Sequence, residues 1–282
     1  MLWLLMVFSI CVLAGLLLAG RLRPDLKAEY EERRRGALRS QPLQHERAPL
    51  TEDSIAPLPP PVRQYLRVTG SLGKPQVQNL QLTFDAKLMK KPGQAGMRGP
   101  ARQFESFEPA RRLFFMTTRM SGLPVSVLHD YNDTRAAMTV RVASLFNVVD
   151  LRSDELARTE TVTLLNDLCC FAPSRVLDPR LDWSPVDDRH ASVTFTNGPH
   201  RVSASLEFDE AGYLVNFFTE DRGALQSGGA LVRYPWSTPL GEYREFEGRK
   251  VATRGETVWH YPAGDFVYGQ FTLTTLQYDV SI

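Results

Sequence analysis

One carboxylate stands in the middle of an apolar stripe within the segment Ser153–Pro173. Glu160 follows Leu156 by four residues and precedes Leu164 by four, and the sequence of this segment is typical of a helix. Residues four apart lie on one face of a helix, so Glu160 should be buried together with the two leucines. An ionised carboxylate is costly to bury unless a cation lies beside it. We therefore expect Glu160 to have an arginine partner.

Three roles are open for Glu160. The first is a buried ion pair that fixes the helix against the rest of the fold. The second is a polar group in the wall of a ligand cavity, and the third is a catalytic acid with a raised pKa. The candidate partners are the arginines near the ends of predicted strands: Arg119, Arg141 and Arg222.

His129 is the second residue whose type and position could support chemistry. It alternates with Val125, Val127 and Tyr131, so the four side chains share one face of a predicted strand. Because that face should point inward, His129 is either a core histidine with satisfied hydrogen bonds or a donor that lines a cavity.

Arg222 and Trp236 complete the set of predicted ligand-binding residues, with Glu160 and His129. The pair Asp221-Arg222 follows a predicted strand, where it can also stabilise a turn. Trp236 lies at the start of an irregular stretch, and a tryptophan there is either part of the core or a platform for a ligand.

Motifs for catalysis and metal binding are missing from the sequence. It contains no G-x-S-x-G, H-E-x-x-H, G-x-G-x-x-G or Walker A pattern. The five histidines are scattered, so any metal site would have to be assembled by the fold. We therefore predict no metal, no cofactor and no enzymatic activity. An enzyme with a site assembled around Glu160, His129 and an arginine is the alternative.

The net charge argues against a nucleic-acid-binding protein, and the cysteine content argues against a disulfide-stabilised one. The formal net charge is +1, from 33 basic and 32 acidic residues, so no bulk field attracts nucleic acid. The three cysteines are Cys11 and the neighbours Cys169 and Cys170. Adjacent helical residues point in different directions, so we expect Cys169 and Cys170 to be buried thiols without a disulfide.

The helix that carries Glu160 should be the centre of the fold. Ser153 can cap its first turn, Asp154 and Glu155 suit the positive end of the helix dipole, and Pro173 ends it. Seven of the ten residues from Val162 to Phe171 are apolar, which is typical of a helix buried on nearly all sides.

Alternating apolar residues predict antiparallel strands on both sides of this helix. Before it the predicted strands are Leu80–Leu88, Gln103–Phe107, Leu113–Met120, Val125–Tyr131 and Ala136–Val142, with a loop at Lys90–Pro100. After it they are Ser192–Thr196, Arg201–Phe208, Tyr213–Glu220, Arg249–Thr253, Glu256–Tyr261 and Phe266–Tyr278. We predict an α+β fold in which a strongly curved antiparallel sheet, a half-barrel, wraps around the one long buried helix.

The N-terminus is typical of a membrane anchor. Leu2–Gly20 contains nineteen residues without a charge, and as a helix it would span about 28 Å, close to the hydrocarbon thickness of a bilayer. No basic residue precedes it and no cleavage site follows, so we favour an uncleaved anchor over a signal peptide. We predict a transmembrane helix in residues 1–20, a juxtamembrane helix that frays into a charged and proline-rich linker in residues 21–57, and one domain in residues 58–282.

Four stretches of the sequence resemble an uncharacterised bacterial family, a domain of unknown function that typically follows one membrane helix. The stretches are Pro59–Leu66, Glu160–Asp167 with Pro173, Asp182-Trp183, and Asp221-Arg222 with Trp236. In the order of strands, helix and strands, the chain is also similar to the half-barrel of the lipoprotein carriers LolA and LolB, whose concave face holds acyl chains. This resemblance implies binding or transfer of a lipid, a lipoprotein or another apolar ligand. A structural or interaction protein of the cell envelope with a packed core is the alternative.

The side of the membrane on which the domain lies is open. Six basic residues follow the uncharged segment and none precedes it, which favours the cytoplasm: Arg21, Arg23, Lys27, Arg33, Arg34 and Arg35. The resemblance to lipoprotein carriers implies the periplasm instead.

Overall fold

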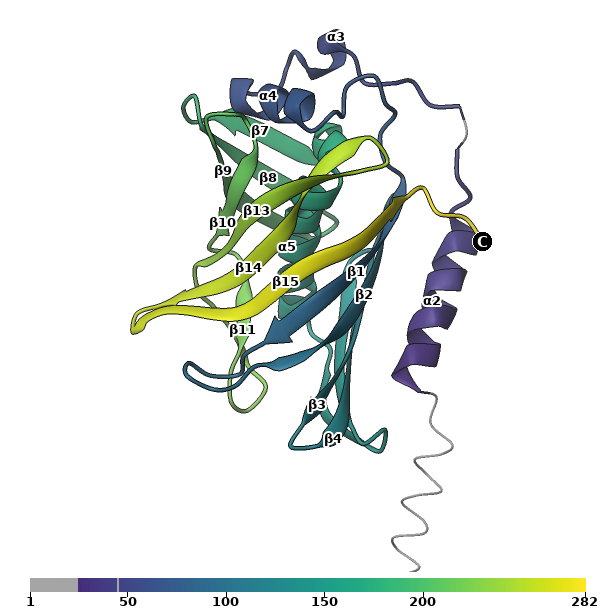
Figure 1. Ribbon diagram of the computed structural model, residues 1–282, viewed down its shortest axis with the longest axis vertical. Helices are drawn as coiled ribbons and strands as arrows, with labels where there is room; N and C mark the ends of the chain where they lie inside the picture. Colours follow the sequence, from purple (N-terminus) through teal and green to yellow (C-terminus); the bar gives the residue numbers. More distant parts are fainter. Residues whose placement is uncertain (1–24, 45) are drawn as a thin grey trace, which may run out of the picture.

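Residues 25–44 and 46–282, which the computed structural model describes, form an α+β fold with a thirteen-stranded antiparallel sheet. The strand order is β6-β5-β4-β3-β2-β1-β15-β14-β13-β10-β9-β8-β7 (Figure 1). The strands before the long helix are β1 (Asn79–Leu88), β2 (Met97–Phe107), β3 (Ala110–Met120), β4 (Leu123–Asn132), β5 (Arg135–Val142) and β6 (Phe146–Leu151). Those after it are β7 (Leu181–Pro185), β8 (His190–Asn197), β9 (His200–Phe208), β10 (Leu214–Thr219), β13 (Trp236–Phe246), β14 (Arg249–Tyr261) and β15 (Gly264–Tyr278). The last strand pairs with the first, so both ends of the domain meet in the middle of the sheet.

The long helix α5 (Asp154–Phe171) lies inside the bend of this sheet. It contacts β4 and β5 on one side and β9, β10 and β14 on the other (Figure 1). Fourteen of its 18 residues are buried. The predicted N-cap is confirmed, because the hydroxyl of Ser153 accepts a hydrogen bond from the backbone N–H of Leu156 at 3.1 Å. The helix is followed by a short 3-10 helix, η1 (Pro173–Leu177).

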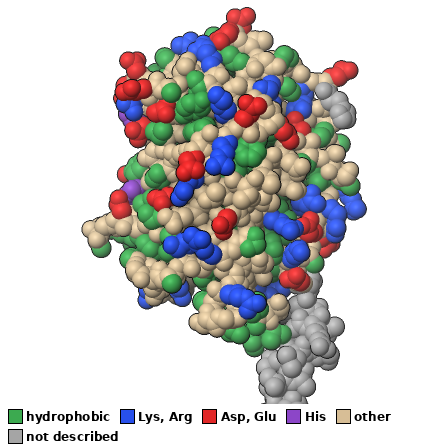
Figure 2. All heavy atoms as spheres, in the orientation of Figure 1, with side chains coloured by type: hydrophobic (Ala, Val, Ile, Leu, Met, Phe, Trp, Pro, Cys, Tyr) green, Lys and Arg blue, Asp and Glu red, His purple; other side chains and the backbone are tan. Residues whose placement is uncertain are grey.

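Acidic and basic side chains are mixed over the surface of the domain. Figure 2 shows them interspersed on one face, with no extended region of a single sign. This distribution agrees with the near-neutral net charge of +1 and gives that face no strong field for nucleic acid.

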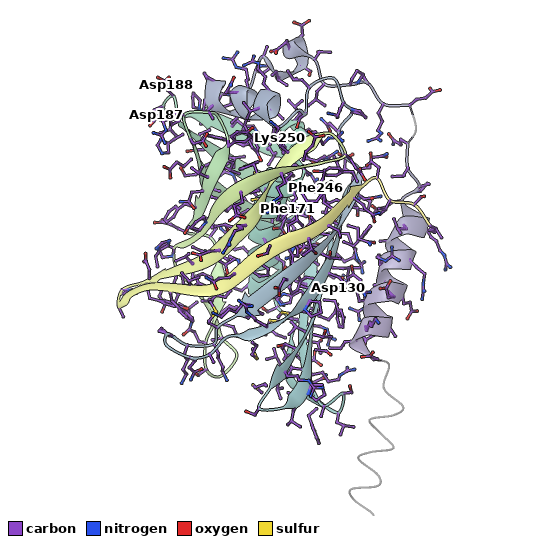
Figure 3. All side chains as sticks on the ribbon, in the orientation of Figure 1. Asp130, Phe171, Asp187, Asp188, Phe246 and Lys250 are labelled. Carbon is purple, nitrogen blue, oxygen red and sulfur yellow. The ribbon has the colours of Figure 1, made fainter. Side chains whose placement is uncertain are left out.

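The helix α2 (Leu26–Ser40) packs on the outer face of β3 and β4. Tyr30 and Leu38 of α2 are buried there against Leu113 and Phe115. An ion pair adds to this contact, because Arg33 of α2 lies 2.7 Å from Asp130 of β4, which Figure 3 labels beside the helix. We predicted a juxtamembrane helix that frays into a charged linker in this part of the chain. The structure has a helix at Leu26–Ser40, and the prediction did not include its packing against the sheet.

Two short helices cover the end of the domain at which α5 finishes. They are α3 (Glu52–Ile55) and α4 (Pro60–Val68). The helix α4 begins within the proline run, and its residues Val62, Tyr65 and Leu66 are fully buried. The hydroxyl of Tyr65 donates a hydrogen bond to the backbone carbonyl of Cys169, which ties α4 to α5 at 2.8 Å.

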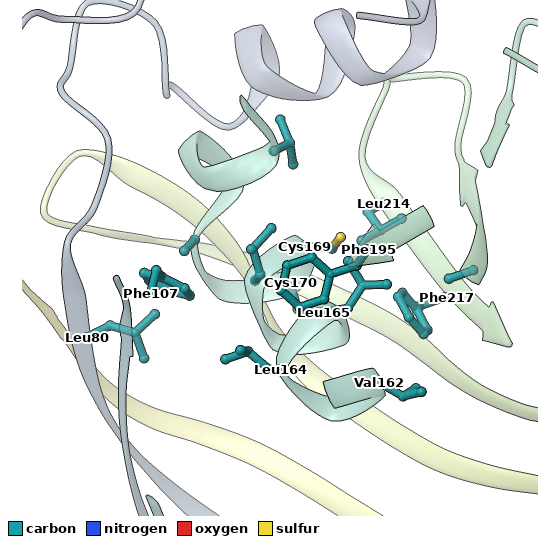
Figure 4. Packing of buried hydrophobic residues seen from close by; sticks show 14 of the residues in the cluster. Leu80, Phe107, Val162, Leu164, Leu165, Cys169, Cys170, Phe195, Leu214 and Phe217 are labelled. Carbon is teal, nitrogen blue, oxygen red and sulfur yellow. The ribbon is translucent and has the colours of Figure 1, made fainter. Parts of the chain in front are cut away.

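The apolar core surrounds the second half of α5. Figure 4 shows Leu165 and Cys169 between Phe195, Leu214 and Phe217 of the sheet. Both helical cysteines are buried free thiols, as predicted.

The predicted strands differ from the structure where glycine and proline interrupt the alternation. We predicted a loop at Lys90–Pro100, but β2 already begins at Met97. Gly99 permits this, because a Cβ atom there would lie 1.8 Å from the backbone oxygen of Thr117 in β3. We missed β13, which contains Pro239 and Gly241 and is defined by its pairing with β10 and β14. The glycine-rich segment after Arg222 forms a hairpin of β11 (Gly223–Leu225) and β12 (Leu231–Arg233).

No helix in the described residues is long and apolar enough to cross a membrane. The predicted transmembrane helix in residues 1–20 lies outside the described residues.

Candidate functional site

A cavity of about 470 Å³ lies between α5 and the concave face of the sheet. Most of its wall is apolar, with aromatic rings from several strands: Phe84, Phe114, Trp236, Trp259 and Phe271. The ring of Phe271 packs edge-on against Phe84 and Phe114, with centroids 5.8 and 6.4 Å apart. The first half of α5 contributes Leu156, Thr159, Glu160 and Thr163 to the same wall.

The polar part of the wall is centred on Arg112 of β3. Its Nη1 lies 3.1 Å from Oε2 of Glu160, and its Nε lies 2.7 Å from Oδ2 of Asp167. Its Nη2 donates to the side-chain oxygen of Gln103 at 3.1 Å. These contacts and the neighbouring Glu105 and His129 define what we call the polar cluster: Gln103, Glu105, Arg112, His129, Glu160 and Asp167.

The arginine that meets Glu160 is therefore not one of the three that we expected. Arg119 lies at an exposed turn and donates to the backbone oxygen of Gly122. Arg141 donates to Asn147 on the neighbouring strand. Arg222 donates to hydroxyl groups, and it affects Glu160 only through its charge.

His129 and Glu160 are brought together, as their predicted inward faces suggested. The ring nitrogen Nδ1 of His129 lies 2.7 Å from Oε1 of Glu160. The ring packs edge-on against Phe114, with centroids 6.0 Å apart. The histidine side chain is 20% exposed and that of Glu160 is 2% exposed, and both residues line the cavity.

The electrostatics of the cluster keep Glu160 ionised. Burial acts to raise the pKa of Glu160, but His129, Arg112 and Arg222 lower it further, to about 2. This is the opposite of the raised pKa that a catalytic acid requires at neutral pH. Burial likewise acts to lower the pKa of Arg112, and the charges of Asp167, Glu160 and Glu105 outweigh it and raise that pKa.

Glu105 behaves in the opposite way to Glu160. Burial and the neighbouring carboxyl group of Asp167 raise its pKa well above the ordinary value, and Arg112 and Gln103 offset this only in part. Its Oε1 accepts a hydrogen bond from Gln103 at 2.7 Å. The cluster thus contains two glutamates whose environments move their pKa values apart.

Arg222 and Trp236, the other two predicted site residues, also line the cavity and contact each other. The guanidinium carbon of Arg222 lies 4.4 Å from the ring centroid of Trp236 and 5.4 Å from that of Trp259. This is a cation–π arrangement with two indole rings. The hydroxyl of Tyr268 accepts hydrogen bonds from Nη1 of Arg222 at 2.8 Å and from Nε1 of Trp236 at 3.1 Å.

The predicted turn-stabilising pair Asp221-Arg222 is not formed. Asp221 instead forms an ion pair with Arg158 of α5 and accepts a hydrogen bond from the backbone N–H of Ser203. In the part of the chain that the structure describes, no group of three or more histidine, cysteine or acidic side chains could hold a metal ion.

One end of the cavity lies at the end of the sheet that carries the β1–β2, β3–β4 and β5–β6 turns. Met89, Lys90 and Met97 line it there, and the β11–β12 hairpin adds Leu225 and Leu231. Large apolar side chains on these turns and hairpins are exposed, and we call them the rim: Met120, Leu123, Phe146, Val148, Leu225 and Val232. Figure 2 shows apolar side chains at this lower end of the molecule.

Four members of the polar cluster were missed from the sequence: Gln103, Glu105, Arg112 and Asp167. Asp167 had a usable signal, because it lies seven residues after Glu160 and so on the same face of the helix. Arg112 lies one residue before the predicted strand Leu113–Met120, and its inward direction could not be inferred from that boundary.

The site is thus an apolar cavity with a charged wall, enclosed by one helix and one curved sheet. Residues 48–271 match the model of DUF6544, a family of unknown function. The chain belongs to this family. A search of curated proteins found no significant match.

Three solved structures are similar to this chain at low sequence identity. A LolA superfamily protein from Nitrosomonas europaea matches with a TM-score of 0.42 and 10% identity, covering 77% of this chain and 92% of that one. A domain described as an outer membrane lipoprotein-sorting protein from Vibrio parahaemolyticus matches with a TM-score of 0.43 and 11% identity, covering 73% and 87%. A DUF1329 family protein from Desulfovibrio piger matches with a TM-score of 0.42 and 11% identity, covering 79% and 95%.

Proposed function

We propose that this protein binds a lipid or another apolar ligand in the cavity between α5 and the sheet, with the sheet acting as a half-barrel. The observation that carries the proposal is the cavity itself, of about 470 Å³ with largely aromatic and aliphatic walls. Binding sites for small molecules are typically about 300–1,000 Å³ in volume, mainly apolar, with a few placed polar groups. A fully packed structural protein, the competing hypothesis, would have no such space.

The polar cluster supports binding because the carboxylate of Glu160 has close partners within the cluster. Arg112 forms an ion pair with it and the ring of His129 lies at hydrogen-bonding distance, so an apolar ligand does not meet Glu160 as an isolated buried charge. Much of the packed apolar core lies around the second half of α5. The domain thus combines a packed apolar core with an apolar cavity.

The rim supports transfer between the cavity and a membrane. Exposed apolar side chains such as Leu123 and Phe146, which are 51% and 52% exposed, lie at the edge to which the cavity opens. The nineteen uncharged residues Leu2–Gly20 would hold the protein at the membrane as a single-pass anchor. The helix α2, which follows them in sequence, starts at the same end of the domain (Figure 1).

Native mass spectrometry tests the proposal directly. The full chain is extracted from its membrane in mild detergent, and its bound molecules are identified after solvent extraction. We expect a lipid or other amphiphile in a one-to-one ratio with the protein. A clean apo mass, repeated after incubation with membrane extract, would contradict the proposal.

A second candidate function is hydrolysis of an ester ligand, and the pairing of His129 with Glu160 at 2.7 Å favours it. If Nδ1–H donates to the carboxylate, Nε2 is an acceptor that can take a proton from water. Turnover of hexadecanoyl p-nitrophenyl ester by the full chain tests this function. A hydrolase should lose turnover in His129→Gln while still binding the substrate, whereas a carrier shows no turnover in either form.

A further inference from the structure

Arg222 forms no ion pair with an acidic side chain in the described part of the chain. Its guanidinium donates to the hydroxyls of Tyr268 and Thr163, at 2.8 Å and 3.3 Å. Among the described residues, none of the ion pairs includes Arg222: its neighbour Asp221 pairs with Arg158. Arg222 is therefore a charged group in a largely apolar wall, with neutral hydrogen-bond partners.

Glu160, the acid whose pKa Arg222 affects, is engaged elsewhere. Its Oε1 lies against His129 and its Oε2 against Arg112, so each carboxylate oxygen already has a close cationic or donor partner. Glu160 attracts Arg222 through space but forms no hydrogen bond with it. A further anion in the cavity would not have to displace this acid.

The indole rings hold Arg222 in a fixed orientation. Its guanidinium carbon lies over both rings, 4.4 Å from the centroid of Trp236 and 5.4 Å from that of Trp259. A guanidinium that stacks on aromatic faces keeps its N–H groups in its own plane, where they can bind a carboxylate with two parallel hydrogen bonds. These ring contacts thus orient the guanidinium without using its N–H donors.

Tyr268 adds a second donor at the same place. Its hydroxyl oxygen accepts hydrogen bonds from Arg222 and from Trp236. A hydroxyl group has one hydrogen to donate in addition to its two acceptor positions. In the described part of the chain no acceptor is assigned to that hydrogen, and Tyr268 lines the cavity.

We propose that Arg222 and Tyr268 bind the carboxylate of a single-chain fatty acid, whose alkyl chain occupies the apolar part of the cavity. This inference rests on the proposed function and names its ligand class. One guanidinium matches one negative charge, whereas a cationic head group would be repelled and a neutral one would gain no ion pair. The cavity, of about 470 Å³, is within the usual size of a site for one small-molecule ligand. We therefore infer a ligand with one alkyl chain.

Competition between two ligands that differ only in the head group tests the inference. Delipidated full-length protein in a non-ionic detergent is mixed with equal concentrations of hexadecanoate and hexadecanol, and native mass spectrometry gives the occupancy of each. We expect hexadecanoate to exceed hexadecanol by at least about tenfold, the effect of one charge-assisted hydrogen-bonded pair. In Arg222→Met the occupancy by hexadecanoate should fall by at least about tenfold, with hexadecanol unchanged.

Arg119→Met is the matched control, because Arg119 is a basic residue of an exposed turn whose side chain binds only Gly122. Retained hexadecanol binding shows that Arg222→Met is folded. If that variant does not fold, Tyr268→Phe should still lower the preference for the acid. Equal binding of acid and alcohol by the wild type would overturn this inference and leave the proposed function standing. Binding of neither would overturn the proposed function itself.

Discussion

The Nη1 atom of Arg112 lies 3.1 Å from Oε2 of Glu160, and the same guanidinium reaches Asp167 at 2.7 Å. One cation from β3 thus joins two carboxylates of α5 and fixes the helix against the sheet. We expect Arg112→Met to lower the free energy of unfolding by about 3–5 kcal/mol, because both acids lose their arginine in a buried site. Glu160→Gln should cost less, because Arg112 keeps Asp167.

Urea unfolding of the full chain measures both values. Arg119→Met, a substitution at an exposed turn, is the control and should change stability by less than about 0.5 kcal/mol. A cost for Arg112→Met no larger than that of the control would show that the ion pairs do not hold α5 in place.

The stability of the fold should depend on pH through Glu160. Its pKa falls from an ordinary 4.5 to about 2 in the folded state. A depressed pKa contributes stability that is present above the unfolded value and is lost as the pH falls from about 4.5 to 2. The shift is worth about 3 kcal/mol. Unfolding measured between pH 2 and 7 should show this loss in the wild type and a smaller one in Glu160→Gln, and equal slopes would contradict the assigned environment.

Glu105 should contribute with the opposite sign. Its pKa is raised by burial and by Asp167, so its favourable contribution is fully present below the ordinary value of 4.5 and is lost as the pH rises through the raised value. Glu105→Gln keeps the neutral shape and cannot ionise. We therefore expect this variant to gain stability relative to the wild type as the pH increases from 4 to 8. A variant that becomes less stable over that range would show that Glu105 is needed as an anion.

Filling the cavity should remove ligand without unfolding the protein. Val140 is half-buried on β5 and lines the cavity, so Val140→Trp should place an indole in the space. We expect ligand occupancy in native mass spectra to fall at least fivefold, with a stability change under about 2 kcal/mol. Thr139→Trp, the adjacent half-buried residue on the opposite face of the strand, is the control and should retain the ligand. Equal occupancy in both variants would mean that the ligand binds elsewhere.

The sequence predicted those parts of the site that depend on local periodicity. Ser153 as N-cap, Glu160 on the buried helix face and His129 on an inward strand face follow from spacings of four and two residues. The contact between His129 and Glu160 needed only the assumption that both inward faces meet. The curved sheet around one helix followed from the same periodicities.

The missed features depend on contacts between distant segments. Arg112 reaches Glu160 because β3 lies beside β4 under the helix, and no local pattern places it there rather than Arg119 or Arg141. The strand β13 contains Pro239 and Gly241, and its pairing with two neighbours overrides their weak strand propensity. The packing of α2 on the sheet is stabilised by the contact of Tyr30 with Phe115, which the charged sequence of this helix does not predict.

The rim should be required for exchange of ligand with membranes but not for the fold. Leu123 and Phe146 are 51% and 52% exposed, so Leu123→Asp with Phe146→Asp removes little buried area and should leave the unfolding curve unchanged. The two carboxylates would face lipid at the open end of the cavity, where desolvating a charge is costly. We expect ligand transfer from labelled vesicles to full-length protein in unlabelled vesicles to slow by at least about tenfold, equivalent to about 1.4 kcal/mol in the barrier.

Val186→Asp is the matched control, since Val186 is 59% exposed and adjoins Asp187, at the opposite end of the domain from the rim (Figure 3). Equal slowing by the control would reduce the effect to a general consequence of added charge, and unchanged transfer in the rim variant would show that ligand enters the cavity by another route.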